Sequence, residues 1–146
     1  MQIRKQIGVV VLMALLAVTL ACTPQDAAFQ TNRTVTAISS ANLAMASSVI
    51  QLNNLGKVDN ELTNQILTYN RDVATSVKAA EVILKSGKQW NVIAPEVLKL
   101  LRDIQLPANV AAFIDHPAVD VGVQGLVAII QTVELLIKQS LVEVQK

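Results

Sequence analysis

Cysteine and histidine are almost absent from this chain, which limits the chemistry available to it. Cys22 is the only cysteine and His116 the only histidine among 146 residues. No disulfide can therefore form within the chain. The carboxylates nearest to His116 in sequence, Asp115 and Asp120, are spaced in a way that fits no zinc motif. We expect no metal site, and we interpret Asp115 or His116 as the cap of a helix that begins at Pro117.

Motifs of other enzyme classes are missing as well. The acidic residues are dispersed along the chain, and most of them fit helix caps or solvated helix faces. Nothing in the sequence resembles an activated serine, a P-loop or a haem-attachment motif. We therefore predict a protein that is not an enzyme, with no catalytic residue and no cofactor.

Aromatic and charged side chains are also scarce, at 3% and 16%, whereas 52% of the residues are hydrophobic. A chain with so few aromatic residues has little to pack a sheet with. No alternation of apolar and polar residues is sustained, while apolar residues recur at spacings of three and four. The sequence therefore predicts an all-α fold of one domain.

The first residues have the layout of a secretory signal peptide. Arg4 and Lys5 provide a positive start, and a largely apolar stretch follows from Ile7 to Ala21. As a helix this stretch would be about 22 Å long, which is short of a hydrocarbon core of roughly 30 Å. A cleaved signal is therefore favoured over the alternative, a permanent transmembrane anchor.

The end of this stretch, Thr19-Leu20-Ala21-Cys22, resembles the lipobox of bacterial lipoproteins. The resemblance implies that the Cys22 thiol receives a diacylglyceryl group and that a signal peptidase cuts between Ala21 and Cys22. It departs from the family at Thr19, where an aliphatic residue is usual. The alternative is an incidental cysteine at the end of an ordinary signal. A lone thiol with no partner favours lipidation.

This layout divides the chain into a signal peptide (1–21), a lipidated N-terminus with a tether (22–33) and a helical domain (34–146). Thr23 occupies the position where an aspartate would, by the same resemblance, signal retention in an inner membrane. The periplasmic face of the outer membrane is therefore expected if the source has two membranes, and a bacterial or a phage origin would fit. Loss of Arg4 and Lys5 leaves ten basic and eleven acidic residues, so the formal charge changes from +1 to −1. No basic face for nucleic acid is implied.

Two long helices are predicted first. One runs from Ala27 or Thr34 to Leu55 and ends at Gly56; its many alanines and serines should let a neighbouring helix approach closely. Its apolar face comprises Ile38, Ala41, Met45, Val49 and Leu52. The other begins after the N-cap Asp59 and ends at Ser86-Gly87. Its apolar stripe comprises Leu62, Ile66, Tyr69, Val73, Val77, Ala80 and Leu84.

A broken third arm and a last long helix follow. Pro95 suits the first turn of a helix, Pro107 interrupts the arm, and a second short helix would hold Val110 to Ile114. The last helix, from Ala118 to Val144, carries one polar arc: Asp120, Gln124, Gln131, Glu134 and Lys138. Because the rest of its surface is aliphatic, it is either the central helix of the bundle or has a partner outside the monomer. The expected fold is a small antiparallel bundle of three long helices plus the broken third arm.

Three further residues have structural interpretations. Trp90 either closes the bundle end over the core, which we favour, or anchors a partner or the bilayer interface. Gly122 and Gly125 lack the strand that precedes a phosphate-binding loop. Either the last helix begins near Gln124, or another helix packs closely on these glycines.

Three hypotheses for function follow. The first is a non-enzymatic envelope lipoprotein, anchored to a membrane through Cys22, whose bundle contacts another protein or the envelope. The second is a carrier that holds an apolar ligand between its helices, which requires a cavity of several hundred Å³. The third is a last helix that associates with lipid or pairs with its copy in a homo-oligomer.

Overall fold

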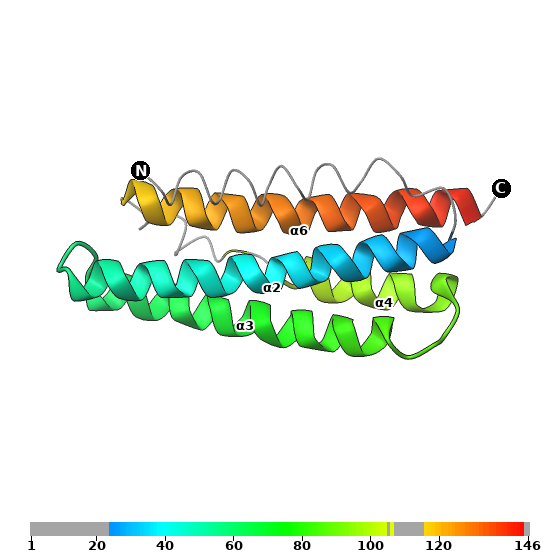
Figure 1. The fold of residues 1–146 in the computed structure, drawn as a ribbon, viewed down its shortest axis with the longest axis horizontal. Helices are drawn as coiled ribbons and strands as arrows, with labels where there is room; N and C mark the ends of the chain where they lie inside the picture. Colours follow the sequence, from blue (N-terminus) through cyan, green and yellow to red (C-terminus); the bar gives the residue numbers. More distant parts are fainter. Residues whose placement is uncertain (1–23, 105, 107–115, 145–146) are drawn as a thin grey trace.

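The computed structural model describes residues 24–104, 106 and 116–144, so the predicted cleavage site at Ala21 and Cys22 lies outside the described residues. Within this part there are four α-helices and no strand: α2 (Pro24–Asn54), α3 (Asn60–Leu84), α4 (Trp90–Arg102) and α6 (Pro117–Val144). Each helix runs opposite to the one described before it (Figure 1). The all-α antiparallel bundle with three long helices is therefore confirmed.

Helix α2 begins ten residues before Thr34, at Pro24. The segment 22–33, for which the sequence predicts a tether, is thus helical from Pro24 onward. The physical reason is that Ala27 and Thr31 are buried, so the core-facing side of the helix, with Ile38, continues toward the N-terminus. Burial of a helix face stabilises a helix more than local propensity does.

The end of α2 is set by Gly56, as predicted. Gly56 has a φ of 66°, a left-handed conformation that glycine adopts without steric cost. The Gly56 N–H donates to the Asn53 carbonyl at 2.8 Å, and the Lys57 N–H donates to the Leu52 carbonyl at 2.9 Å. These two bonds form a Schellman motif, which satisfies carbonyls that a helix end otherwise leaves without partners.

Helix α3 agrees with its prediction at both ends and along its apolar stripe. The Asp59 carboxylate accepts a hydrogen bond from the Leu62 N–H at 2.7 Å, as an N-cap does. The helix ends at Leu84, and Gly87 follows with a φ of 72°. Of the predicted apolar stripe, Leu84 is half-buried and the other members are buried. The opposite side is exposed: Asn64, Arg71, Thr75 and Lys78.

Helix α4 corrects the prediction for Pro95. The helix begins at Trp90, so Pro95 lies inside it rather than in its first turn. The cause is an apolar stripe that extends upstream of the proline, since all of its residues are buried: Trp90, Ile93, Ala94, Val97, Leu98 and Leu101. Burial of these side chains outweighs the one backbone hydrogen bond that proline cannot donate. Pro107 and the second short helix lie outside the described residues.

Helix α6 begins at Pro117, and its N-cap position is occupied by His116. The His116 carbonyl accepts hydrogen bonds from the Val119 and Asp120 N–H groups, each at 3.0 Å. This agrees with the helix-cap interpretation of His116, with proline at the first helical position. Asp115, the other candidate cap, lies outside the described residues.

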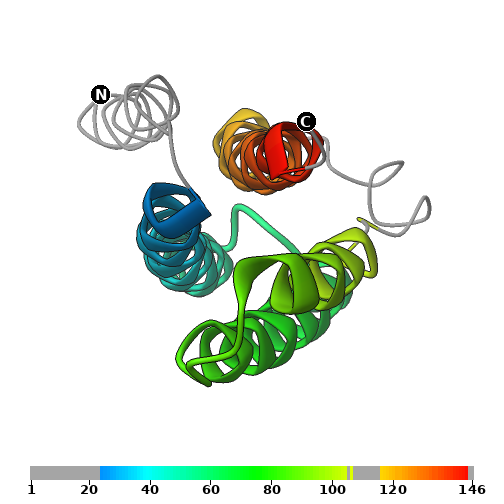
Figure 2. The same ribbon diagram turned by 90° about the vertical axis from the view of Figure 1, so that its right-hand side faces the viewer.

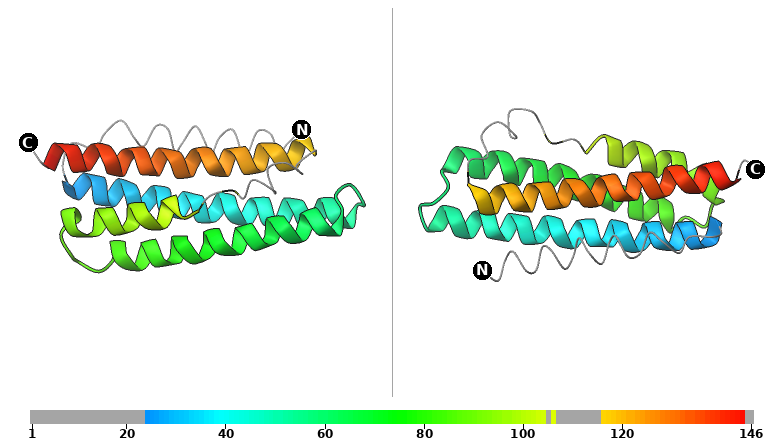
Figure 3. Two further views of the ribbon diagram at one scale, coloured as in Figure 1. Left: turned by 180° about the vertical axis from the view of Figure 1, so that it is seen from behind. Right: turned by 90° about the horizontal axis from the view of Figure 1, so that it is seen from above.

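Helix α2, not α6, makes the most extensive packing contacts with the other helices. It packs against α3 and α6 along its length and touches α4, whereas α6 packs chiefly on α2 and α4 (Figure 2). Seen from behind, α3 lies on the side of the bundle away from α6 (Figure 3, left). Of the two alternatives for the last helix, the central position is therefore wrong.

Helices α2 and α3 are joined in the core by two asparagines. The Asn42 amide nitrogen donates to the Asn70 carbonyl at 2.8 Å, and the Asn70 amide nitrogen donates to the Asn42 carbonyl at 3.3 Å. Both residues are buried. Each side-chain amide donates to a backbone carbonyl of the other helix. Because only one alignment of the two helices allows both hydrogen bonds, this pair favours that alignment.

Asn42→Ala is expected to lower the free energy of unfolding by about 1–3 kcal/mol, since it removes the buried hydrogen bond that the Asn42 side chain donates to the Asn70 carbonyl. Urea unfolding followed by circular dichroism measures the change. Asn64→Ala is the matched control, because Asn64 is exposed on α3, and it should change stability by less than about 0.5 kcal/mol. An equal decrease in the free energy of unfolding in the two variants would show that the buried Asn42–Asn70 hydrogen bonds do not stabilise the fold.

Candidate functional site

Side chains that could ligate a metal ion do not converge in the described part of the chain. Nowhere within it do three side chains of histidine, cysteine, aspartate or glutamate come close enough to hold a metal ion. Tyr69 is buried, and desolvation raises the pKa of its phenol to about 12, so that it stays neutral at physiological pH. The candidate site is therefore sought among the surfaces of the bundle.

Trp90 closes one end of the bundle, as favoured from the sequence. It is buried, and its indole Nε1–H donates to Ser140 Oγ at 3.0 Å. Ser140 Oγ in turn donates to the Ile137 carbonyl at 2.8 Å. This chain of hydrogen bonds joins the start of α4 to the last turns of α6. The exposed-anchor alternative for Trp90 is therefore wrong.

Both glycines of the last helix lie inside α6, which begins well before Gln124. Gly122 faces Met45 on α2, and a Cβ added at Gly122 would lie 3.5 Å from Met45 Cγ. The close approach of another helix is thus present. The distance is an ordinary van der Waals contact, so the packing does not itself require glycine there.

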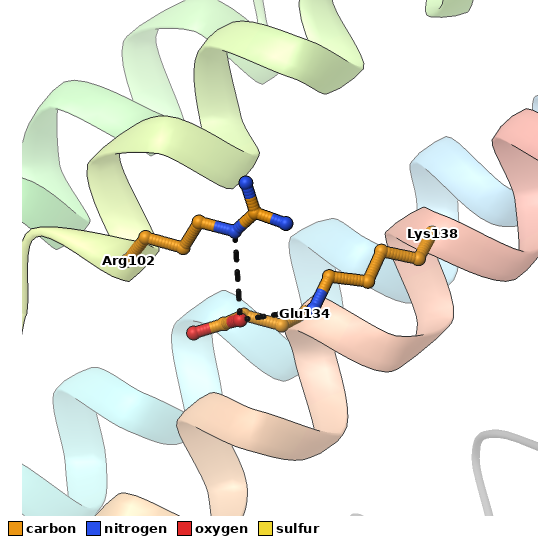
Figure 4. Close-up of polar contacts among 3 residues, drawn as sticks. All are labelled: Arg102, Glu134 and Lys138. Carbon is orange, nitrogen blue, oxygen red and sulfur yellow. Dashed lines mark hydrogen bonds and ion pairs between the residues drawn. The ribbon is translucent and has the colours of Figure 1, made fainter.

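The polar arc of α6 meets the end of α4 at a small charged cluster (Figure 4). Glu134 Oε2 lies 3.5 Å from Lys138 Nζ and 3.9 Å from Arg102 Nε. The Arg102 and Lys138 side chains are about half exposed. Pairs of this kind contribute roughly 0.2–1 kcal/mol each, so the cluster orients α4 on α6 more than it stabilises the fold.

A row of side chains spaced by seven residues lies on the outer face of α2. We call it the α2 stripe: Phe29, Thr36, Leu43 and Ile50. At 100° per residue its members lie within about 60° of one another. All four are exposed, with Phe29, Leu43 and Ile50 at 60%, 70% and 45%. No charged residue occurs between Thr34 and Gly56, which is unusual for a helix face turned to water.

Helix α6 carries a second row with the same spacing, which we call the α6 stripe: Val121, Ala128, Leu135 and Val142. It lies opposite the buried face of α6, which includes Val119, Val133 and Ile137. Leu135 and Val142 are 51% and 57% exposed, and the other two are half-buried. The bundle therefore covers only one side of this aliphatic helix.

The same two helices are long and apolar enough to cross a membrane, over Asp26–Asn54 and Val119–Val142. Less than half of each window is buried in the bundle. Length and composition alone are weak evidence for a span, because core helices of bundles share them.

Comparison of the chain with protein-family models, with curated proteins and with solved structures gives no match. The case for the two stripes as candidate binding surfaces therefore rests on their exposure and spacing alone. Apolar residues at spacings of three and four mark the buried faces of these helices. They do not reveal the exposed stripes on the opposite faces. A seven-residue recurrence links the members of each stripe, but it also links buried residues such as Ile38 and Met45, so only the packed structure shows which rows stay exposed.

Proposed function

We propose that the protein is a lipid-anchored envelope protein without enzymatic activity, whose bundle binds a helical partner through the α6 stripe. The observation that supports this best is an aliphatic row left uncovered on the side of α6 that faces away from the core. In a source with two membranes, the anchor at Cys22 would hold the domain at the periplasmic face of the outer membrane.

The chemistry of the α6 stripe favours a helix as the partner. The α6 stripe supplies one of the two positions per seven residues at which apolar side chains pack along a seam between two helices. Ala128, together with Gly125 beside the row, leaves room for a close backbone approach. The partner is therefore expected to present an uncharged apolar helix face, and a second copy of α6 would satisfy this requirement.

A bundle held beside the membrane is favoured over one that spans it. Helix α3 packs along α2 and presents Arg71, Asp72 and Lys78 as exposed side chains. If α2 crossed the bilayer within this bundle, these charges would enter the hydrocarbon region, at a cost of roughly 2.5–3.5 kcal/mol each. An external lipid anchor avoids that cost.

A photo-crosslinking amino acid at position 128 or 135, introduced in intact cells, is expected to form one discrete adduct, either with a second copy or with one envelope protein. The same amino acid at position 131 is the matched control, because Gln131 is exposed on the polar arc of the same helix. Val121→Lys should reduce the adduct formed from position 135, since it places a charge in the same seam. Equal adducts at 131 and 135, or none at either stripe position, would contradict the proposal.

A further inference from the structure

The distance between the proposed anchor and the bundle is very short, because the structure shows α2 beginning at Pro24. Cys22 precedes Pro24 by two residues. Two residues span at most about 7 Å when fully extended. A lipid on Cys22 would therefore hold the first turns of α2 at the bilayer surface, with no tether to lift the domain away from it.

We propose that the bundle lies on the membrane along α2, with the α2 stripe in contact with the bilayer. This inference rests on the proposed lipid anchor and adds to it an orientation and a lipid-binding surface. The stripe starts at Phe29, seven residues after Cys22, and continues along the same helix face to Ile50. An amphipathic helix in this position buries its apolar side chains about 5–10 Å into the boundary between headgroups and acyl chains.

Two hydroxyl side chains near the middle of this face, Thr36 and Ser40, already donate hydrogen bonds within the helix. The Thr36 hydroxyl donates to the Asn32 carbonyl at 3.0 Å, and the Ser40 hydroxyl donates to the Thr36 carbonyl at 3.3 Å. Because these donors are satisfied within the helix itself, moving them toward the acyl chains leaves no hydroxyl hydrogen without a partner. The charge-free run from Thr34 to Gly56 removes the largest penalty for such contact.

The two charges on the outer face, Asp26 and Arg33, lie near the anchored end. The Arg33 guanidinium carbon is 5.9 Å from the centre of the Phe29 ring. A long arginine side chain can lie along an apolar surface while its charge stays at headgroup level. With only one anion and one cation on this face, contact should depend on apolar burial and respond little to salt.

The test uses the mature lipidated protein, reconstituted into phosphatidylcholine–phosphatidylglycerol vesicles. Since the lipid occupies the Cys22 thiol, Leu43→Cys and Val82→Cys each introduce a single reactive thiol for a polarity-sensitive dye. Val82 is the matched control, because it is 65% exposed and lies on α3. The dye at position 43 is expected to brighten several-fold and to be quenched by nitroxide-labelled lipid at low and high salt, whereas the dye at position 82 should do neither.

The possible outcomes distinguish failure of the proposed bilayer contact from failure of the proposed lipid anchor at Cys22. If the protein floats with the vesicles but the dye at position 43 reports water, the anchor stands and the contact is overturned. Equal responses at 43 and 82, or a stronger response at 82, would overturn it in favour of a bundle standing on its end. Shielding at 43 without quenching by labelled lipid would indicate a protein cover and would also overturn it. Failure to float would overturn the anchor and the inference together.

Discussion

Cys22→Ser is expected to abolish labelling of the protein by radioactive palmitate and to leave an uncleaved precursor. A serine hydroxyl cannot take the place of the thiol that carries the lipid in the lipobox family. By the lipobox resemblance, Cys22 both carries the lipid and marks the cleavage site, so both events should fail together. Metabolic labelling measures the first, and the size of the product on a denaturing gel measures the second.

Thr19→Leu is the matched control for this experiment. It changes the one position at which the segment Thr19-Leu20-Ala21-Cys22 departs from the usual lipobox. Labelling and cleavage should be at least as complete as in the original chain. Continued labelling of the Cys22→Ser variant would refute the anchor, and the orientation proposed for α2 would be refuted with it.

Ile38→Ala is expected to be the most destabilising of the simple core substitutions on α2. The Ile38 side chain is fully buried, in the cluster that α2 forms with α3 and α6. Its truncation removes apolar burial and leaves a cavity, a combination that lowers the free energy of unfolding by about 2–5 kcal/mol. Since small domains are stable by only about 5–15 kcal/mol, the urea midpoint should fall markedly.

Ile50→Ala provides the control with the same chemistry on the same helix. Ile50 belongs to the α2 stripe and is 45% exposed, so its truncation should lower stability by less than about 1 kcal/mol. The two variants together test the assignment of inner and outer faces of α2. Equal destabilisation would show that the stripe is part of a packed interior rather than a surface.

Much of the fold could be predicted because its signals are local. Asp59 caps α3 through a hydrogen bond to a residue three positions away, and Gly56 ends α2 through its own backbone conformation. The apolar faces of α2 and α3 follow from the helical repeat alone. Composition likewise excludes disulfides within the chain and disfavours a sheet.

Contacts between residues far apart in the chain could not be predicted from local sequence signals. Trp90 meets Ser140, and Asn42 meets Asn70, across 50 and 28 residues of chain. Nothing near any of these residues in sequence indicates its partner. The candidate site shares this property, because a stripe becomes a surface only when the packing of neighbouring helices leaves it uncovered.

The sequence by itself therefore determined the helical class, the caps and turns between helices, and the expectation of a lipid anchor at Cys22. Only the tertiary structure decided that α2 reaches back to Pro24, that α4 begins ahead of Pro95, and that α6 keeps one aliphatic side exposed. The physical reason is the same in each case. Helix length and side-chain burial depend on which other helices cover a face, and that is a property of the assembled bundle rather than of any local segment.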